Sequence, residues 1–185
     1  MHVEKYSLGP VLVTPRRFED DRGFFSETFG DARFRAAVAD VSFVQDNHSL
    51  SRAPGTIRGL HYQAPPMAQG KLVRVVRGAI LDVAVDIRHG SPTFGEHVAV
   101  ELSADNWAQL WVPEGFAHGF CTLAPDTEVV YKVTASYSPD HDFGLAFDDP
   151  ELAIDWPVPP SAAVLSDKDR RHPRLAELPH HFTVS

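Results

Sequence analysis

The segment LDVAVDIR, which spans Leu81–Arg88, alternates strictly between two kinds of side chain. Its odd-numbered positions hold leucine, valine, valine and isoleucine, whereas Asp82 and Asp86 occupy even-numbered positions. A repeat of two residues puts successive side chains on opposite faces of a β-strand, so the segment predicts a strand with one apolar face. The other face has two interpretations: it meets solvent, or it places Asp82 in the wet interior of a barrel near the chemistry.

Similar strand-like runs cover much of the chain, rich in β-branched or aromatic residues and bounded by Pro, Gly, Asp or Asn. The predicted strands are Val41–Leu50, Thr56–Gln63, Lys71–Arg77, Ala79–Arg88, His97–Leu102, Ala108–Val112 and Thr127–Tyr137. Their short, regular spacing favours a sandwich or barrel. One short helix is predicted at Asp31–Val38, capped by Asp31. From Asp148 onward, prolines and polar turns predict a segment that wraps the body, so residues 1–185 are expected to form one domain.

The composition of the chain excludes several classes of partner. A net charge of −8 argues against nonspecific binding to nucleic acid. Cys121 is the only cysteine and lies in an apolar run, so we expect a buried thiol, no internal disulfide and a reducing cytoplasm. Met1–Pro10 has no secretion-signal core, and the longest apolar segment, Ala79–Ile87, is interrupted by two aspartates. We therefore predict a cytoplasmic protein with no membrane partner.

Ten histidines raise the question of a metal site. Two histidines separated by one residue on a strand share a face and can share a metal, but His61 is followed at that spacing by Gln63. His118 ends the segment Pro113–His118, which is similar to the second half of a cupin metal motif. One histidine from each half gives too few ligands for a tight zinc or iron site, so no metal is predicted. The sequence also lacks the glycine-rich loops that bind nucleotide cofactors, and no cofactor is predicted.

Four ionisable residues have complementary roles in acid–base chemistry. In the run Arg58–Gln63 (RGLHYQ), His61 can serve as a base near neutral pH. Lys71 can place a cation beside a developing oxyanion, and Tyr131 can act as a buried acid. Asp169 can orient His61 and stabilise its charged form. Each residue also has a structural interpretation, such as a core tyrosine or a charged turn, but together they suit proton transfer at a carbon beside a carbonyl.

Three cations are available to bind an anionic substrate: Arg22, Arg58 and Lys168. A diphosphate suits such planar or flexible cations. Surface ion pairs are the alternative interpretation of all three.

Several segments resemble, in order along the chain, those of the dTDP-4-dehydrorhamnose 3,5-epimerases, metal-free cupins that act on nucleotide-activated keto sugars. They are Asp21–Glu27, Val44–Ser49, Arg58–His61, Lys71–Arg88, Gly90–Gly95, Val112–Phe120, Asp155–Pro157 and Leu165–Asp169. The resemblance covers nearly the whole chain. It implies an all-β, cupin-type jelly-roll β-barrel with short flanking helices, a homodimer that exchanges strands, no cofactor and a dTDP-4-keto-6-deoxy sugar as substrate.

The resemblance also implies a role for each candidate residue. His61 would remove the proton beside the C4 ketone with Asp169 as its partner, and Tyr131 would return a proton to the opposite ring face. Lys71 would stabilise the enolate oxygen. The implied binding residues are Arg22, Arg58 and Lys168 near the diphosphate; Phe25, Glu27, Gln45 and Asn47 at the nucleotide end, partly from a neighbouring subunit; and His118 and Tyr137 in the sugar pocket.

The activity implied is epimerisation at C3 and C5 of dTDP-4-dehydro-6-deoxy-D-glucose to dTDP-4-dehydro-L-rhamnose. A mono-epimerase acting at one of these carbons is an alternative, because Thr134–Tyr137 stands where many relatives carry an acidic residue followed by two aromatics. A non-catalytic sugar-nucleotide-binding cupin is more remote, since binding alone needs no acid–base pair. A metal-dependent cupin oxygenase is disfavoured by Gln63.

Overall fold

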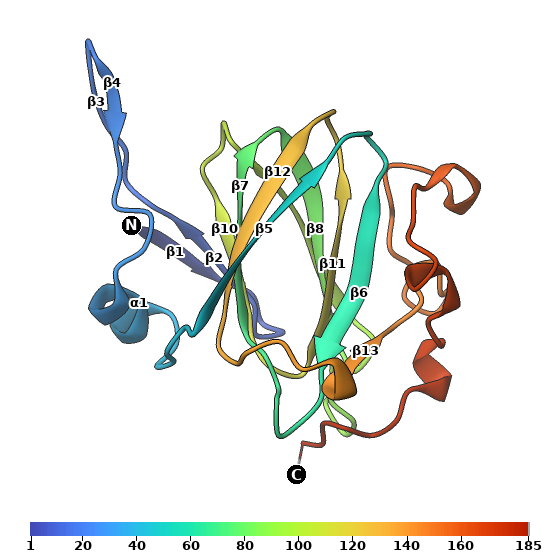
Figure 1. Cartoon of the computed structure of the whole chain (residues 1–185). Coiled ribbons are helices and arrows are strands. Elements are labelled where there is room, and N and C mark those ends of the chain that lie inside the picture. Colours follow the sequence, from blue (N-terminus) through green and yellow to red (C-terminus); the bar gives the residue numbers. More distant parts are fainter. Residues whose placement is uncertain (185) are drawn as a thin grey trace.

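The computed structural model describes residues 1–184, and strands dominate it (Figure 1). The strands are β1 (His2–Lys5), β2 (Val11–Thr14), β3 (Phe18–Asp20), β4 (Gly23–Phe25), β5 (Gln45–Ser51), β6 (Ile57–Gln63), β7 (Lys71–Arg77), β8 (Ala79–Asp86), β9 (His97–Ser103), β10 (Gln109–Val112), β11 (Phe116–Thr122), β12 (Thr127–Val133) and β13 (Asp142–Gly144). The helical elements are α1 (Asp31–Ala37) and short 3-10 helices at Pro139–His141, Pro160–Ala162, Asp169–Arg171 and Leu175–Glu177. The all-β prediction is confirmed.

Two sheets face each other across the interior of the molecule. One has the strand order β1-β2-β10-β7-β12-β5, and the other has the order β13-β6-β11-β8-β9. Figure 1 shows the first sheet towards the left and the second towards the right. Chain neighbours such as β5 and β6, or β7 and β8, lie in different sheets, and the paired strands are antiparallel. This arrangement is the predicted cupin-type jelly roll.

Strand β8 has both faces buried. Ile80 and Ala84 belong to the apolar core between the sheets, and Asp82, which lies between them on the same face, is 0% exposed. The opposite, apolar face packs beneath the C-terminal segment, against residues such as Leu175. The interior placement of Asp82 is therefore confirmed, and the solvent-facing interpretation is wrong because the C-terminal segment covers the apolar face.

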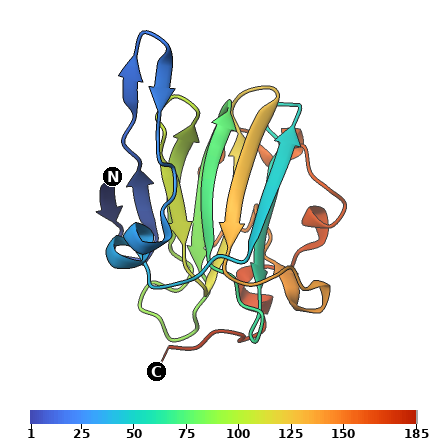
Figure 2. The same cartoon turned by 60° about the vertical axis from the view of Figure 1, so that its left-hand side comes forward.

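The N-terminal part of the chain is less enclosed. The hairpin β3–β4 projects from the body (Figures 1 and 2), and its Phe18, Phe24 and Phe25 are 51%, 55% and 71% exposed. Behind it, α1 packs Phe34 edge to face against Trp111 on the outer side of the six-stranded sheet. None of the helices within residues 1–184 is long and apolar enough to span a bilayer.

Each predicted strand overlaps an observed one; Lys71–Arg77 matches β7 at both ends, whereas the others differ at one end or both. The strand predicted to start at Val41 starts at Gln45, and the one predicted to end at Tyr137 ends at Val133. The predicted helix is confirmed, although Gly30 rather than Asp31 is its N-cap.

Strand β11 was missed by the sequence prediction, as were the short strands β1–β4 and β13. All seven residues of β11 are buried, because it lies in the middle of its sheet between β6 and β8. Its sequence, FAHGFCT, places apolar residues on both faces, so no period-two signal marks it as the aspartates mark β8. Cys121 on β11 is buried as predicted, and this burial raises the pKa of its thiol to about 11.

Strands β6 and β11 approach very closely at two glycines. A Cβ atom at Gly59, whose φ is +126°, would lie 2.7 Å from Gly119 Cα and 2.8 Å from the carbonyl oxygen of His118. The same pair of strands places His61 directly opposite His118. The glycine in the RGLHYQ run therefore sets how near two polar interior residues come to each other.

We expect Gly59→Ala to lower the free energy of unfolding by on the order of 2–4 kcal/mol, because strain at positive φ adds to overpacking between two backbones. The matched control is Gly23→Ala. Gly23 has the same φ of +126°, but a Cβ atom there would have no neighbour within 4 Å, so only the strain, about 1 kcal/mol, should appear. Urea unfolding of both variants measures the difference. Equal losses would contradict a role for the close approach.

Candidate active site

His61 and Asp169 form a hydrogen-bonded pair between β6 and the C-terminal segment. His61 Nε2 lies 2.6 Å from Asp169 Oδ1. Asp169 is the first residue of the 3-10 helix Asp169–Arg171. Its backbone N donates to Ser166 Oγ at 3.1 Å, which fixes the local turn. Because Nε2–H donates to the carboxylate, Nδ1 is the ring nitrogen left to take a proton. The structure thus brings together the two residues that the sequence paired.

The charge states of this pair suit a base. Burial lowers the pKa of His61 below its ordinary value, against the opposing hydrogen bond and charge of Asp169. Burial alone would raise the pKa of Asp169, but hydrogen bonds from His172 and His61 bring it well below its ordinary value. At neutral pH the pair is therefore a neutral imidazole beside a carboxylate.

His172 is a second donor to Asp169 that the sequence did not single out. Its Nε2 lies 3.3 Å from Asp169 Oδ1, and its ring meets the His61 ring edge to face with centroids 5.4 Å apart. A side chain at Gly144 would overlap the His172 ring, so the glycine on β13 makes room for it. Within residues 1–184, His61, Asp169 and His172 form the group whose ligand atoms lie close enough, within 4.8 Å, to hold a metal. Hydrogen bonds already join all three.

Lys71, at the start of β7, points into the interior and is 8% exposed. Its Nζ donates to the backbone carbonyl of His61 at 3.2 Å. Burial lowers the pKa of Lys71 to about 8, although the charges of Asp142 and Asp82 act in the opposite direction. A buried ammonium beside the base can stabilise a negative charge that develops on a bound substrate.

Asp82 and His118 form a second carboxylate–imidazole pair in the interior. His118 Nε2 donates to Asp82 Oδ1 at 2.8 Å, and both side chains are almost fully buried. Among the described residues, no group donates to Asp82 Oδ2. Its negative charge therefore favours the protonated form of Lys71, while His118 faces His61 across β6 and β11. The sequence identified His118 but gave Asp82 no role in binding or catalysis.

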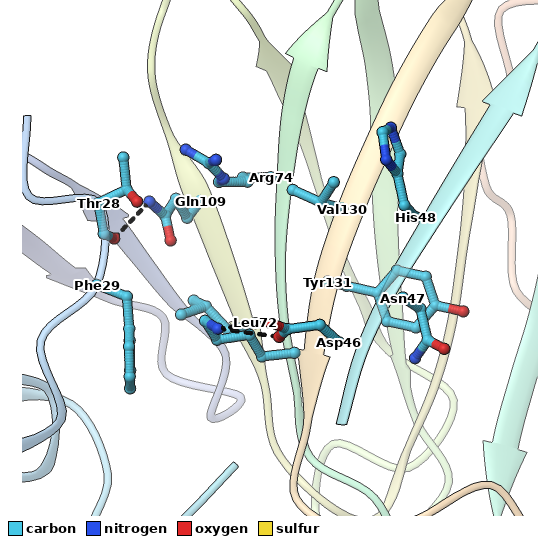
Figure 3. A pocket seen from close by; sticks show the side chains of 11 residues that line it. Thr28, Phe29, Asp46, Asn47, His48, Leu72, Arg74, Gln109, Val130 and Tyr131 are labelled. Atoms are coloured by element: carbon cyan, nitrogen blue, oxygen red, sulfur yellow. Dashed lines mark hydrogen bonds and ion pairs between the residues drawn. The ribbon is translucent and has the colours of Figure 1, made fainter. Parts of the chain in front are cut away.

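Tyr131 lies on β12, in the six-stranded sheet. Figure 3 shows its hydroxyl and the side chain of Asn47 pointing away from Phe29, which lies on the outer side of that sheet. Burial raises the pKa of Tyr131; the charge of Arg58 opposes this increase and that of Asp142 reinforces it. The phenol therefore keeps its proton at neutral pH, as a general acid must.

Asp142 joins two residues that the sequence placed at different parts of the substrate. The Tyr137 hydroxyl donates to Asp142 Oδ2 at 3.1 Å, and Lys168 Nζ donates to the same oxygen at 2.5 Å. Asp142 was missed because it opens the three-residue strand β13, which is too short to show a periodic pattern. Arg58 is held elsewhere, by donation from Nε to Ser51 Oγ at 3.0 Å.

A cavity of about 260 Å³ lies among these residues and is bounded by strands of both sheets. Its lining is Gln45, Asn47, His61, Tyr62, Gln63, Gln69, Lys71, Tyr131, Tyr137 and Asp142. Most small-molecule pockets are larger, roughly 300–1,000 Å³. The cavity suits a sugar ring better than a whole sugar nucleotide.

The structure does not bring Arg22, Phe25 and Glu27 to this cavity. Arg22, at the turn of the β3–β4 hairpin, pairs with Asp20 at 2.6 Å. Phe25 and Glu27 instead line a separate cavity beside α1. In one chain, therefore, the predicted nucleotide-binding residues are divided between two places.

Comparison with known proteins identifies the family. A family profile described as dTDP-4-dehydrorhamnose 3,5-epimerase matches residues 7–177. The chain belongs to the dTDP-4-dehydrorhamnose 3,5-epimerase family. The resemblance seen in the sequence is thus confirmed.

Members of the epimerase family match the chain along nearly its whole length. The dTDP-4-dehydrorhamnose 3,5-epimerase of Sinorhizobium fredii is 57% identical over 183 residues, which cover 98% of this chain and 93% of that protein. The Bacillus anthracis enzyme, solved with TDP and PPi bound, is 52% identical with a TM-score of 0.90, covering 94% and 98% of the two chains. The Legionella pneumophila enzyme, in complex with dTDP-4-keto-L-rhamnose, is 41% identical with a TM-score of 0.94, covering 100% and 98%.

We expect Lys71→Met to stabilise the protein at pH 7, by on the order of 1–3 kcal/mol, because it removes a buried charge. Below pH 8, Lys71 is protonated in both the folded and the unfolded protein, so the wild type bears the full free-energy cost of burying the charge. Between pH 8 and pH 10.5 only the unfolded chain keeps the proton, so the wild type becomes more stable as the pH rises. The difference in unfolding free energy between Lys71→Met and wild type should therefore shrink over this range. Urea unfolding at several pH values measures this. A less stable variant at pH 7 would contradict it.

Proposed function

We propose that this protein converts dTDP-4-dehydro-6-deoxy-D-glucose to dTDP-4-dehydro-L-rhamnose by inverting C3 and C5. The proposal is carried by one observation: His61 and Tyr131 enter one cavity from opposite sheets. A proton removed from one side of a sugar ring between them can be replaced from the other side, which is what inversion requires. The ligand of the Legionella relative, dTDP-4-keto-L-rhamnose, supports this class of substrate.

Proton removal is assigned to His61. The C4 ketone acidifies the hydrogens at C3 and C5, and the free Nδ1 of His61 accepts one of them. The imidazolium that forms is stabilised by Asp169, whose carboxylate already lies 2.6 Å from Nε2. A positioned base of this kind contributes roughly 10²–10⁴ in rate.

Stabilisation of the resulting enolate is assigned to Lys71. One enolate oxygen, at C4, serves both epimerisations, so one cation can stabilise both intermediates. The low dielectric around a lysine that is 8% exposed strengthens this interaction, which is expected to contribute on the order of 10²–10³ in rate. The charges of Asp142 and Asp82 oppose the effect of burial on the pKa of the lysine and so favour its protonated form before substrate arrives.

Reprotonation is assigned to Tyr131. The phenol gives its proton to carbon on the face opposite His61. Arg58 stabilises the phenolate that remains, since its charge already acts to lower the pKa of Tyr131. Water can then restore the proton. The sugar itself is assigned to Tyr137 and the other residues that line the cavity. His118, which is paired with Asp82 behind this lining, is assigned a supporting role, and Lys168 is assigned to the diphosphate.

A mono-epimerase is the nearest rival. Thr134–Tyr137, beside the sugar pocket, departs from the family pattern of an acidic residue followed by two aromatics, and only Tyr137 keeps the aromatic pattern. The identity of 57% with a 3,5-epimerase over nearly the whole chain favours epimerisation at both carbons. A sugar-nucleotide-binding protein without catalysis is disfavoured by the assembled base, acid and cation.

Proton NMR in deuterium oxide tests the reaction. Wild-type protein should exchange both the C3 and the C5 protons of dTDP-4-dehydro-6-deoxy-D-glucose. His61→Asn should slow both exchanges by roughly 10² or more. Tyr131→Phe should lose inverted product more than it loses exchange, because the base remains. Tyr6→Phe, a tyrosine packed against the core and outside the cavity lining, is the matched control.

Exchange at one carbon alone would identify a mono-epimerase. No exchange at either carbon would reject the proposed reaction for this sugar. Equal loss of exchange and product in Tyr131→Phe would count against its role as the acid.

We further propose a homodimer in which the β3–β4 hairpin completes the site of a second copy. The hairpin projects from the body and exposes three phenylalanines, although apolar side chains of this size are normally covered. The cavity around His61 is small for a sugar nucleotide, and the nucleotide-binding candidates Arg22 and Phe25 lie on that hairpin. A third cavity, of about 320 Å³, lies on the outer face of the six-stranded sheet and is distinct from the one beside α1 (Figure 3). Its lining includes Arg74, Gln109 and, from the chain that follows the hairpin, Thr28.

Mixing two inactive variants tests the shared site. Arg22→Ala and His61→Asn should each be impaired alone. In a mixed dimer, one site combines an intact body with an intact hairpin, so an equal mixture after subunit exchange should recover about a quarter of wild-type activity. Light scattering measures the mass of the particle. A mixture with only the sum of the two residual activities, or a monomer, would contradict the proposal.

We also propose that the chain acts as one domain in the cytoplasm. The C-terminal segment supports the first point, because it packs on β8 and supplies Asp169.

A further inference from the structure

Residues 134–138 form the loop between β12 and the 3-10 helix Pro139–His141, and this loop carries Tyr137 to the cavity. Backbone groups of four consecutive loop residues bind glutamine side chains. The bonds are Gln69 Nε2 to Ala135 O (2.6 Å), Gln63 Nε2 to Ser136 O (3.1 Å), Tyr137 N to Gln45 Oε1 (3.0 Å) and Ser138 N to Gln63 Oε1 (2.8 Å). We call Gln45, Gln63 and Gln69 the glutamine clamp.

Gln63 is the centre of the glutamine clamp. It is 3% exposed, and its amide makes a third bond, from Nε2 to Met67 O at 2.7 Å. Both amide hydrogens and the carbonyl oxygen are thereby used. A buried amide that satisfies three backbone groups leaves them no alternative partner if it is removed.

The position of Gln63 links the loop to the base. It lies two residues after His61 on β6, so both side chains project from the same face of one strand. The amide holds Ser136 and Ser138, which flank Tyr137 on either side. The distance between the base and Tyr137 is thus fixed by one strand and one side chain.

Tyr137 itself has little else to hold it. Its side chain is 57% exposed and its hydroxyl donates to Asp142. Ala135 and Ser136 are too small to anchor the loop by apolar packing. The backbone bonds of the glutamine clamp therefore decide where the tyrosine ring stands.

We propose that Gln63 is a positioning residue that sets Tyr137 against the substrate, so that the glutamine clamp governs substrate affinity. This inference rests on the proposed function of the same cavity. Gln63 stands where a metal-binding cupin would have its second histidine, and here the side chain orders a wall of the pocket. Without the Gln63 amide, the loop samples several positions, and part of the binding free energy of the substrate must be used to order the loop. This raises KM but leaves proton transfer by His61 largely intact.

Two substitutions test the proposal. Gln63→Met removes the amide and should raise KM roughly tenfold or more, with kcat changed much less. Gln63→Glu keeps the acceptor for Ser138 N but turns a carboxylate toward two carbonyl oxygens, which raises its pKa. Protonated at pH 6, it can donate to one of them. Relative to wild type at the same pH, its KM should therefore be nearly normal at pH 6 and raised at pH 8.5, whereas Gln63→Met is raised at both.

Thr122→Val is the matched control for loss of stability. Thr122 Oγ1 donates to Ala53 O at 2.8 Å and accepts from Thr56 N at 3.0 Å, so this same-shape change releases another buried loop, away from the cavity. Its KM should equal that of wild type. Calorimetric titration with dTDP-D-glucose, which carries a sugar ring but no C4 ketone and so is not turned over, should show weakened binding in Gln63→Met but not in Thr122→Val.

The outcomes separate the two proposals. Wild-type protein that exchanges no substrate protons rejects the proposed function. Active wild type with an unchanged KM in Gln63→Met, or a KM in Gln63→Glu that does not depend on pH, rejects the positioning role. A loss of kcat equal to that of His61→Asn would also overturn it, because Gln63 would then act on the chemistry.

Discussion

The distance between the two facing sheets is the constraint on which the site depends. Facing sheets lie about 10 Å apart, which leaves room for one layer of side chains or for a small ring. Where apolar residues fill this layer, the molecule has its core; where Lys71 and Tyr131 replace them, it has a cavity. His61 and Tyr131, the proposed base and acid, belong to different sheets, so neither can move without its sheet. Groups on the two sheets therefore reach opposite faces of a ring bound between them.

Closing the interior has an electrostatic consequence. Asp82, Asp169 and Lys71 are all nearly removed from water, and isolated buried charges of this kind are costly. Each carboxylate is paired with a histidine, and the lysine lies within the field of a carboxylate. The low dielectric strengthens every one of these interactions. Within residues 1–184 no carboxylate forms an ion pair with this lysine, so its charge is available to a negative charge on the substrate.

The sequence predicted much of this arrangement but not all of it. Alternation identified β8, and the family motifs indicated His61, Lys71, Tyr131 and Asp169 as a set. Strand β11 escaped because it carries apolar residues on both faces and lacks the regularly spaced aspartates that mark β8. Asp142 and His172 escaped because their places in the site depend on contacts with Lys168 and with the His61 ring, which are distant in the chain, and no local pattern encodes such contacts. Asp82 was recognised as a possible interior residue, yet only its contact with His118 shows what it does there.

The contact between His61 and Asp169 also has a consequence for the order in which the site is assembled during synthesis. The strands of both sheets are complete once β13 has left the ribosome, whereas the carboxylate that orients His61 arrives later, in the segment that wraps the finished barrel. A nascent chain can therefore close its barrel before Asp169 reaches His61, the proposed base. On the proposed mechanism, a chain that ends before Asp169 has little catalytic activity.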